Sequence, residues 1–235
     1  MNKVEVNIIT EGQTEQTFVR DVLAPYMAGK RIYLYPALIG KQGQKGGGVC
    51  FSRAESDIGI FLKQRKDTYV STMFDYFRID PKWPGKDQIS IKARTGMDLG
   101  TTDKAKLLED ETHRIITESF PECNASNRFI PYIEMHEFEA LLFSDVSILA
   151  AKIGIREINL RKILREFSCP EDINDNPDGA PSKRLEALKI GYRKSVMGPV
   201  ILNTIGIPKI REKCPHFDEW LKKLENLTGG ANGET

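Results

Sequence analysis

The sequence lacks any hydrophobic run long enough to cross a membrane, and its first residues, MNKVEVNIITEG, lack the apolar segment of a signal peptide. It also lacks an excess of charge of one sign, because 34 basic and 33 acidic residues leave a net charge of +1. We therefore expect a cytoplasmic protein without a membrane partner. Any contact with nucleic acid must come from a local basic patch.

Several common functional motifs are also missing. Four cysteines are scattered without a C-x-x-C pair: Cys50, Cys123, Cys169 and Cys214. This spacing argues against a structural zinc site and a disulfide framework. The glycine-rich segment 40–48 lacks the Gly-Lys-Ser/Thr ending of a P-loop, and HEFEA at 136–140 has Ala140 where a zinc protease motif needs its second histidine.

The first 145 residues alternate between strand and helix patterns. Strands are predicted at 4–10, 31–39, 69–75 and 128–134, with Pro36 placing the second near an edge of the sheet. Helical spacing after Thr14, over 51–66 and over 103–120 predicts the helices, with Thr14 and Asp103 as caps. Segment 76–102 is predicted to be a long irregular loop. Such alternation predicts an α/β domain over residues 1–145, with a mainly parallel sheet flanked by helices.

The last third has a different pattern, with no further strand. Helices are predicted at 146–153, 160–167, 182–192 and 217–227, with a loop at 170–181. We therefore expect a C-terminal all-helical extension over 146–228, packed on the α/β domain, and a disordered tail at 229–235.

Three acids stand where predicted strands end. Glu11 follows the first strand, Asp75 closes the third and Glu134 closes the fourth. In a parallel sheet the site lies beyond the carboxyl ends of the strands, so these acids should share one rim. Carboxylate oxygens favour Mg²⁺ or Mn²⁺ over zinc. Without a cation the acids repel each other, so at least one should have a raised pKa.

The segment from Glu134 to Glu139 adds three carboxylates and an imidazole within six residues, EMHEFE. Glu137 is a further candidate metal ligand, and His136 is either a ligand, a proton shuttle or a structural histidine. Glu15 is either an acid that complements a helix dipole or a proton-transfer group. For Asp75, the alternative to a metal ligand is a turn-forming aspartate.

Basic residues in the helical third are candidate contacts for a phosphate backbone: Lys183, Arg184, Lys194 and Arg211. Lys183 and Arg184 are the preferred pair. A solvated helix face is the alternative interpretation of this charge. Cys-Pro-His at 214–216 is interpreted as packing at a helix boundary rather than as a metal site.

The strand that runs into EGQTE at 11–15 resembles the first motif of Toprim domains, particularly those of overcoming-lysogenization-defect (OLD) nucleases. Asp75 occupies the place of the Toprim Asp-x-Asp motif. The whole chain also resembles the bacterial family called domain of unknown function 4276. The shared segments are EGQTE, FDYF at 74–77, HEFEALLFSD at 136–145, PSKR at 181–184 and IREKCPHFDEWL at 210–221.

These resemblances imply a Toprim-like fold and a metal-dependent phosphodiesterase, specifically a nuclease acting on DNA or RNA. They also imply a role in phage defence with an ABC-type ATPase as protein partner. The metal would be held by Glu11, Asp75, Glu134 and Glu137. Proton transfer would fall to Glu15, His136 or Lys183.

One departure keeps a second interpretation open. The Toprim motif would place another acid at position 77, where this chain has Phe77. Asp80 could replace that acid, or the metal site could be built differently. The alternative function is a Toprim-like regulatory or binding subunit, inactive alone, that docks on an ATPase through its helical third.

Overall fold

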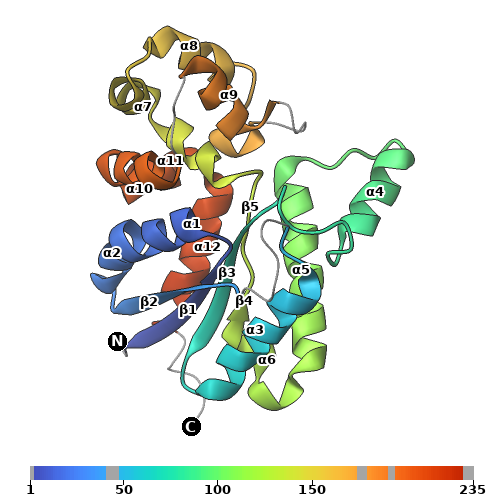
Figure 1. Ribbon diagram of the computed structural model, residues 1–235. Helices are drawn as coiled ribbons and strands as arrows, with labels where there is room; N and C mark the ends of the chain where they lie inside the picture. Colours follow the sequence, from blue (N-terminus) through green and yellow to red (C-terminus); the bar gives the residue numbers. More distant parts are fainter. Residues whose placement is uncertain (1–2, 41–47, 174–178, 190–193, 230–235) are drawn as a thin grey trace.

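The computed structural model describes residues 3–40, 48–173, 179–189 and 194–229, with the backbone alone at 194 and 195 (Figure 1). Most of the glycine-rich segment and nearly all of the predicted tail therefore lie outside the described residues. Among the described residues, no helix has the length and apolar character needed to span a membrane.

One mainly parallel sheet forms the centre of the protein. Its strands are β1 (Val4–Thr10), β2 (Ile32–Leu38), β3 (Tyr69–Asp75), β4 (Phe129–Ile130) and β5 (Ile133–Glu134). Their order is β2-β1-β3-β4, and β5 continues beside β3, with every pairing parallel. The fold class and the first three strands are confirmed. Pro36 lies in the edge strand β2, where its missing amide costs no ladder bond.

The predicted fourth strand is instead two short strands. Pro131 lies between β4 and β5, and proline cannot donate to a ladder. At this break, the hydroxyl of Thr72 replaces the hydrogen bonds that a neighbouring strand would make. It accepts a hydrogen bond from the amide of Tyr132 and donates to the carbonyl of the same residue, both at 3.0 Å.

Helices cover both faces of the sheet (Figure 1). In the first part of the chain they are α1 (Gln13–Phe18), η1 (Val19–Leu23), α2 (Ala24–Ala28), α3 (Phe51–Gln64), α4 (Lys86–Arg94), α5 (Thr101–Ser119), η2 (Pro121–Cys123) and α6 (Ala125–Arg128). Two predicted caps are wrong, because α1 is capped by Gly12 rather than Thr14, and α5 by Gly100 rather than Asp103. The segment predicted to be an irregular loop contains α4, which projects from the body of the molecule (Figure 1).

The last third contains helices joined by short turns, with no strand among its described residues. Its elements are η3 (Phe138–Ser144), α7 (Val146–Ile153), α8 (Glu157–Leu164), η4 (Pro170–Asp172), α9 (Pro181–Leu188), α10 (Lys194–Ile205), α11 (Ile207–Lys213) and α12 (Pro215–Asn226). Sequence patterns missed α10 and α11, because Gly198 and Pro199 interrupt the periodicity of α10.

The last helix packs on the sheet itself. Trp220 of α12 stacks on Tyr132 with ring centroids 4.3 Å apart, and its indole N–H donates to the Ser71 hydroxyl of β3 at 2.9 Å. Apolar residues of β1, α1 and the C-terminal helices belong to one buried cluster. The helical extension therefore shares its core with the sheet.

Candidate functional site

The predicted acidic rim exists at the carboxyl edge of the sheet. Asp75 and Glu134 are register partners at the ends of β3 and β5. The carboxylate of Glu11, which directly follows β1, accepts a hydrogen bond from the Asp75 amide at 3.4 Å. The three strand ends thus bring Glu11, Asp75 and Glu134 together, as expected for parallel strands.

Glu134 is the acid of this rim for which a negative charge is most costly. Its side chain is fully buried, and its Oε2 accepts a hydrogen bond from the Tyr132 hydroxyl at 2.6 Å. Its Oε1 has no hydrogen-bond partner. Burial raises the pKa of Glu134 well above its ordinary value, so its cause differs from the predicted repulsion among the three strand-end acids.

Other carboxylates add to this effect. Glu171 raises the pKa of Glu134 next after burial, and Glu139 and Glu15 raise it further, whereas the Tyr132 hydroxyl lowers it. These three acids are themselves buried. They come from η4, η3 and the first turn of α1, so the helical third supplies part of the acidic cluster. Such a set of buried carboxylates is costly unless protons or cations neutralise it.

Two predicted ligands also hold the backbone around the rim. Asp75 Oδ1 accepts the Phe138 amide at 2.9 Å, at the start of η3. Glu137 Oε2 accepts the Ser182 amide at 3.1 Å, in the first turn of α9. Each carboxylate thus accepts a hydrogen bond from an amide in the first turn of a short helix, where the helix itself offers that amide no carbonyl partner. Glu137 thereby connects the rim to the helix that carries Lys183 and Arg184.

His136 lies between aromatic rings. Its imidazole is buried and stacks on Phe77 at 5.3 Å, with the edge of Tyr76 at 5.5 Å. Phe77, which stands where the Toprim motif has an acid, therefore packs on the candidate proton shuttle. Lys86 lies over the other aromatic ring, 3.5 Å from the Tyr76 centroid, and burial lowers its pKa to about 8.

The donor chemistry of this rim suits a hard cation, because the oxygens are carboxylates and Glu134 Oε1 lacks a partner. The arrangement is less complete. Among the residues that the structure describes, no three His, Cys, Asp or Glu side chains are placed to hold a metal ion. Glu11 Oε1 instead lies 3.5 Å from Arg78 Nε. Glu11, Asp75 and Glu134 thus share one rim without forming a coordination sphere, and the Glu137 carboxylate is turned to the amide of Ser182.

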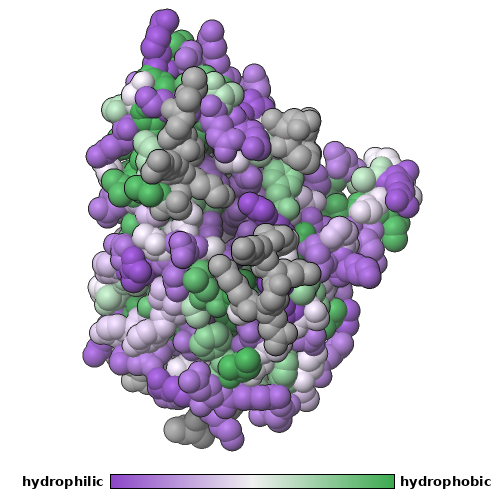
Figure 2. Space-filling model, in the orientation of Figure 1, coloured by the Kyte–Doolittle hydropathy of each residue, from purple (hydrophilic) through white to green (hydrophobic). Residues whose placement is uncertain are grey.

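The three predicted basic residues whose side chains the structure describes do not form one patch. Lys183 is exposed and pairs with Glu186 at 2.9 Å. Arg184 donates to the Gly179 carbonyl and lies over Phe167. Arg211 is turned inward, where it pairs with Asp218 at 2.5 Å and with Glu225. The side chain of Lys194 lies outside the described residues. The face seen in Figure 2 is largely hydrophilic, with smaller hydrophobic areas between.

A cavity of about 670 Å³ lies in the helical third. Its walls come from η3, α7, α8 and α11, and its cations are Arg161, Lys209 and Lys213. Both lysines pair with Glu212 at 2.9 Å. None of the four predicted metal ligands lines this cavity, so the acidic rim and the cavity are separate features.

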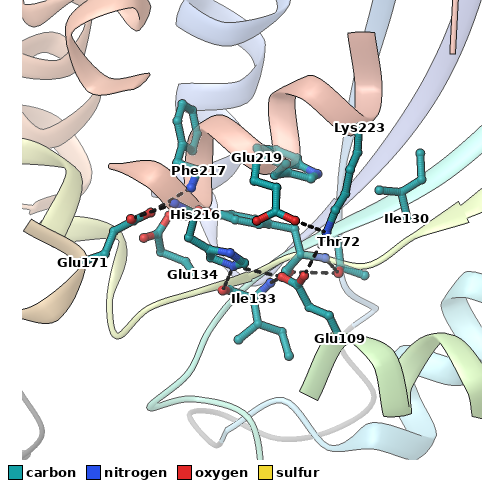
Figure 3. A network of polar contacts seen from close by, with 12 residues as sticks. Thr72, Glu109, Ile130, Ile133, Glu134, Glu171, His216, Phe217, Glu219 and Lys223 are labelled. Atoms are coloured by element: carbon teal, nitrogen blue, oxygen red, sulfur yellow. Dashed lines mark hydrogen bonds and ion pairs between the residues drawn. The ribbon is translucent and has the colours of Figure 1, made fainter. Parts of the chain in front are cut away.

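A second polar network lies beside the rim, and sequence reasoning missed it (Figure 3). The buried Glu109 of α5 approaches His216 Nε2 at 3.0 Å, and Glu171 accepts the amides of His216 and Phe217 at 3.0 and 2.8 Å. The sequence signal for Glu109 was its place on the apolar face of α5, beside Leu108. His216 was assigned to boundary packing, which describes its place at the start of α12 but not its polar partners.

Comparison with curated proteins and with solved structures found no significant match to either. A family model described as "Domain of unknown function (DUF4276)" matches residues 10–225. The matched segment includes the acidic rim, the helices on both faces of the sheet and most of α12. The chain therefore belongs to the DUF4276 family.

Proposed function

We propose that this protein is a metal-dependent phosphodiesterase, specifically a nuclease. The observation that supports the proposal most is Glu134, a fully buried carboxylate with an unbonded oxygen among other buried acids at the carboxyl edge of a parallel sheet. A cation offsets the cost of such a cluster, and carboxylate oxygens favour Mg²⁺ or Mn²⁺.

In this proposal the rim supplies the oxygen ligands, from Glu11, Asp75, Glu134 and Glu137. A divalent cation held by these oxygens would supply charge neutralisation on the phosphate and a more acidic water. Glu15 and His136, both buried on the rim, hold or move protons. Lys183, whose side chain is 59% exposed, contacts the phosphate backbone with Arg184 beside it.

The finer parts of the proposal rest on resemblance. A Toprim-like arrangement agrees with EGQTE at the end of β1 and with Asp75 at the end of β3. We extend the proposal to phage defence together with an ABC-type ATPase, with DNA or RNA as substrate. The exposed parts of the helical third are the proposed surface for that partner.

Incubation of the pure protein with Mn²⁺ and a panel of single- and double-stranded DNA and RNA tests the activity. Cleavage should require the cation and should be lost in Glu134→Gln. The matched control is Glu118→Gln on α5, whose carboxylate is exposed and paired with Arg114 at 2.9 Å. Cleavage that persists in Glu134→Gln would contradict the proposal.

A second candidate is a binding or regulatory subunit that keeps this fold and is inactive alone. It is favoured by the open arrangement of the rim, in which the described residues offer no group of three metal ligands and Glu11 contacts Arg78. This function predicts no cleavage by the pure protein, and stable association with an ATPase that survives Glu134→Gln.

A further inference from the structure

The short strand β5 has one open edge. It pairs with β3 on one side, and no described strand lies on the other. The outward backbone groups of Ile133 are bonded to side chains instead (Figure 3). Its amide donates to Glu109 Oε1 at 3.0 Å, and its carbonyl lies 3.2 Å from His216 Nε2. A carboxylate and an imidazole thus replace the neighbouring strand.

The proton position on His216 follows from its neighbours. Nε2 lies 3.0 Å from Glu109 Oε1 and 3.2 Å from the Ile133 carbonyl, and both of these atoms are acceptors. Nε2 therefore carries a hydrogen and donates. Glu109, His216 and Ile133 form a closed triangle in which each backbone group of Ile133 has a partner.

This triangle is itself held in place by three further residues. Glu171 of η4 accepts both amides at the start of α12, which fixes the backbone of His216. The ring of Tyr132 stacks on the imidazole at 5.0 Å. Lys223, further along α12, lies 3.5 Å from the other oxygen of Glu109.

At its other edge, β5 pairs with β3 and places Glu134 on the rim. The carbonyl of Glu134 accepts the Tyr76 amide at 2.9 Å, and Glu134 is the register partner of Asp75. Because β5 is two residues long, its position depends on bonds at both edges. We propose that Glu109 and His216 are positioning residues, a β5 latch through which α5 and α12 hold Glu134 on the rim. The role of Glu134 as a cation ligand rests on the proposed function.

The latch is tested first in metal-free protein by amide hydrogen exchange. In His216→Asn and in Glu109→Leu, the amides of Ile133 and Tyr76 should exchange at least tenfold faster, because the two edges of β5 loosen together. Glu109→Gln keeps an acceptor for the Ile133 amide and should restore slow exchange. His113→Asn is the matched control, since His113 lies on the same helix as Glu109 and contacts the Ser126 carbonyl at 3.0 Å.

Amides in β1, such as that of Ile8, separate the latch from general loss of stability. Their exchange should stay unchanged in Glu109→Gln and His113→Asn, and should change less than that of Tyr76 in His216→Asn. If the Ile133 amide loses protection while the Tyr76 amide keeps it, the latch does not position Glu134 and the inference is overturned.

Mn²⁺ binding then connects the latch to the cation. His216→Asn should weaken Mn²⁺ binding at least tenfold, whereas the control His113→Asn should leave it unchanged. Equal binding by the wild type and His216→Asn would show that the latch does not act on the cation site. If the wild type binds no Mn²⁺, the proposed function fails, whereas the exchange experiment still decides the latch.

Discussion

At the residue scale, the acidic rim is a place where burial and charge oppose each other. Glu134 is fully buried and surrounded by Glu15, Glu139 and Glu171. Burial favours the neutral form of a carboxyl group, and neighbouring carboxylates favour it further. In metal-free protein this acid therefore binds a proton more tightly than it does in the unfolded chain.

Glu134→Gln should consequently be more stable than the wild type without metal. The raised pKa of Glu134 gives stability that is fully present below its unfolded value near 4.5 and is lost as pH rises through the folded value. Glutamine does not titrate, so the variant should gain about 1–3 kcal/mol in free energy of unfolding at pH 8. Urea unfolding at pH 4.5 and pH 8 measures this. A difference that does not grow with pH would contradict the account.

His216 should show its own pH dependence. Burial alone would lower its pKa, but Glu109 and then Glu171 raise it above the ordinary value of 6.5, against Lys223. Its contribution is therefore full below pH 6.5 and is lost as pH rises through the folded pKa. His216→Asn should lose more stability at pH 6 than at pH 9, by urea unfolding. A loss that is independent of pH would mean that the imidazole acts as a neutral hydrogen-bond donor and through packing, without a contribution from its charged form.

At the element scale, the loop after β3 and helix α4 depend on one glycine. Gly85 has φ +87°, and a Cβ there would lie 2.7 Å from the Leu107 side chain of α5. Any residue with a Cβ is therefore strained there, and it must displace the end of the Leu107 side chain while approaching the Leu107 carbonyl oxygen at 3.3 Å. The turn sets the direction of α4 and places Lys86 over Tyr76.

Gly85→Ala and Gly96→Ala separate these two costs. Gly96 has φ +78°, but no atom lies within 4 Å of the place that a Cβ would take, so its variant carries backbone strain alone. Gly85→Ala should be less stable than Gly96→Ala by about 1–3 kcal/mol, because it also displaces Leu107. Urea unfolding of both variants measures the difference. Equal losses of stability in the two variants would mean that α5 accommodates the added methyl group at no cost in free energy.

The sequence allowed the parallel sheet to be predicted well, and the reasons are local. The β-branched runs of β1 and β3 end abruptly at Glu11 and Asp75, so both strand and rim positions follow from composition. The break at Pro131 and the helix α4 needed tertiary information. Side-chain caps were misassigned because both helices begin before Thr14 and Asp103, directly after an extended Gly12 and Gly100 without a side-chain cap.

Less of the candidate site could be predicted from the sequence. Glu11, Asp75 and Glu134 were predicted to meet because strand ends converge, and they do. Glu171 and Glu109 reach the site from distant helices. A glutamate in an amphipathic helix is most often solvated, so spacing alone could not show that Glu109 is buried against Ile133.

At the scale of the whole molecule, the helical third is part of the site rather than an addition to it. Glu139 and Glu171 contribute buried charge, α9 is tied to Glu137, and α12 completes the edge of the sheet. Removing the C-terminal helix should therefore unfold the rim together with the core. The family match likewise runs from the last residue of β1 into α12.

The central claim is that the rim binds a divalent cation through Glu134 and Glu11. Thermal melts of the wild type, Glu134→Gln and Glu11→Gln, each with and without Mn²⁺, test it most directly. A ligand at one hundred times its Kd stabilises the folded state by about 2.7 kcal/mol, which is a clear shift in Tm. We expect Mn²⁺ to raise the Tm of the wild type and to leave both variants, still folded, nearly unchanged. Equal shifts in all three proteins would contradict the claim.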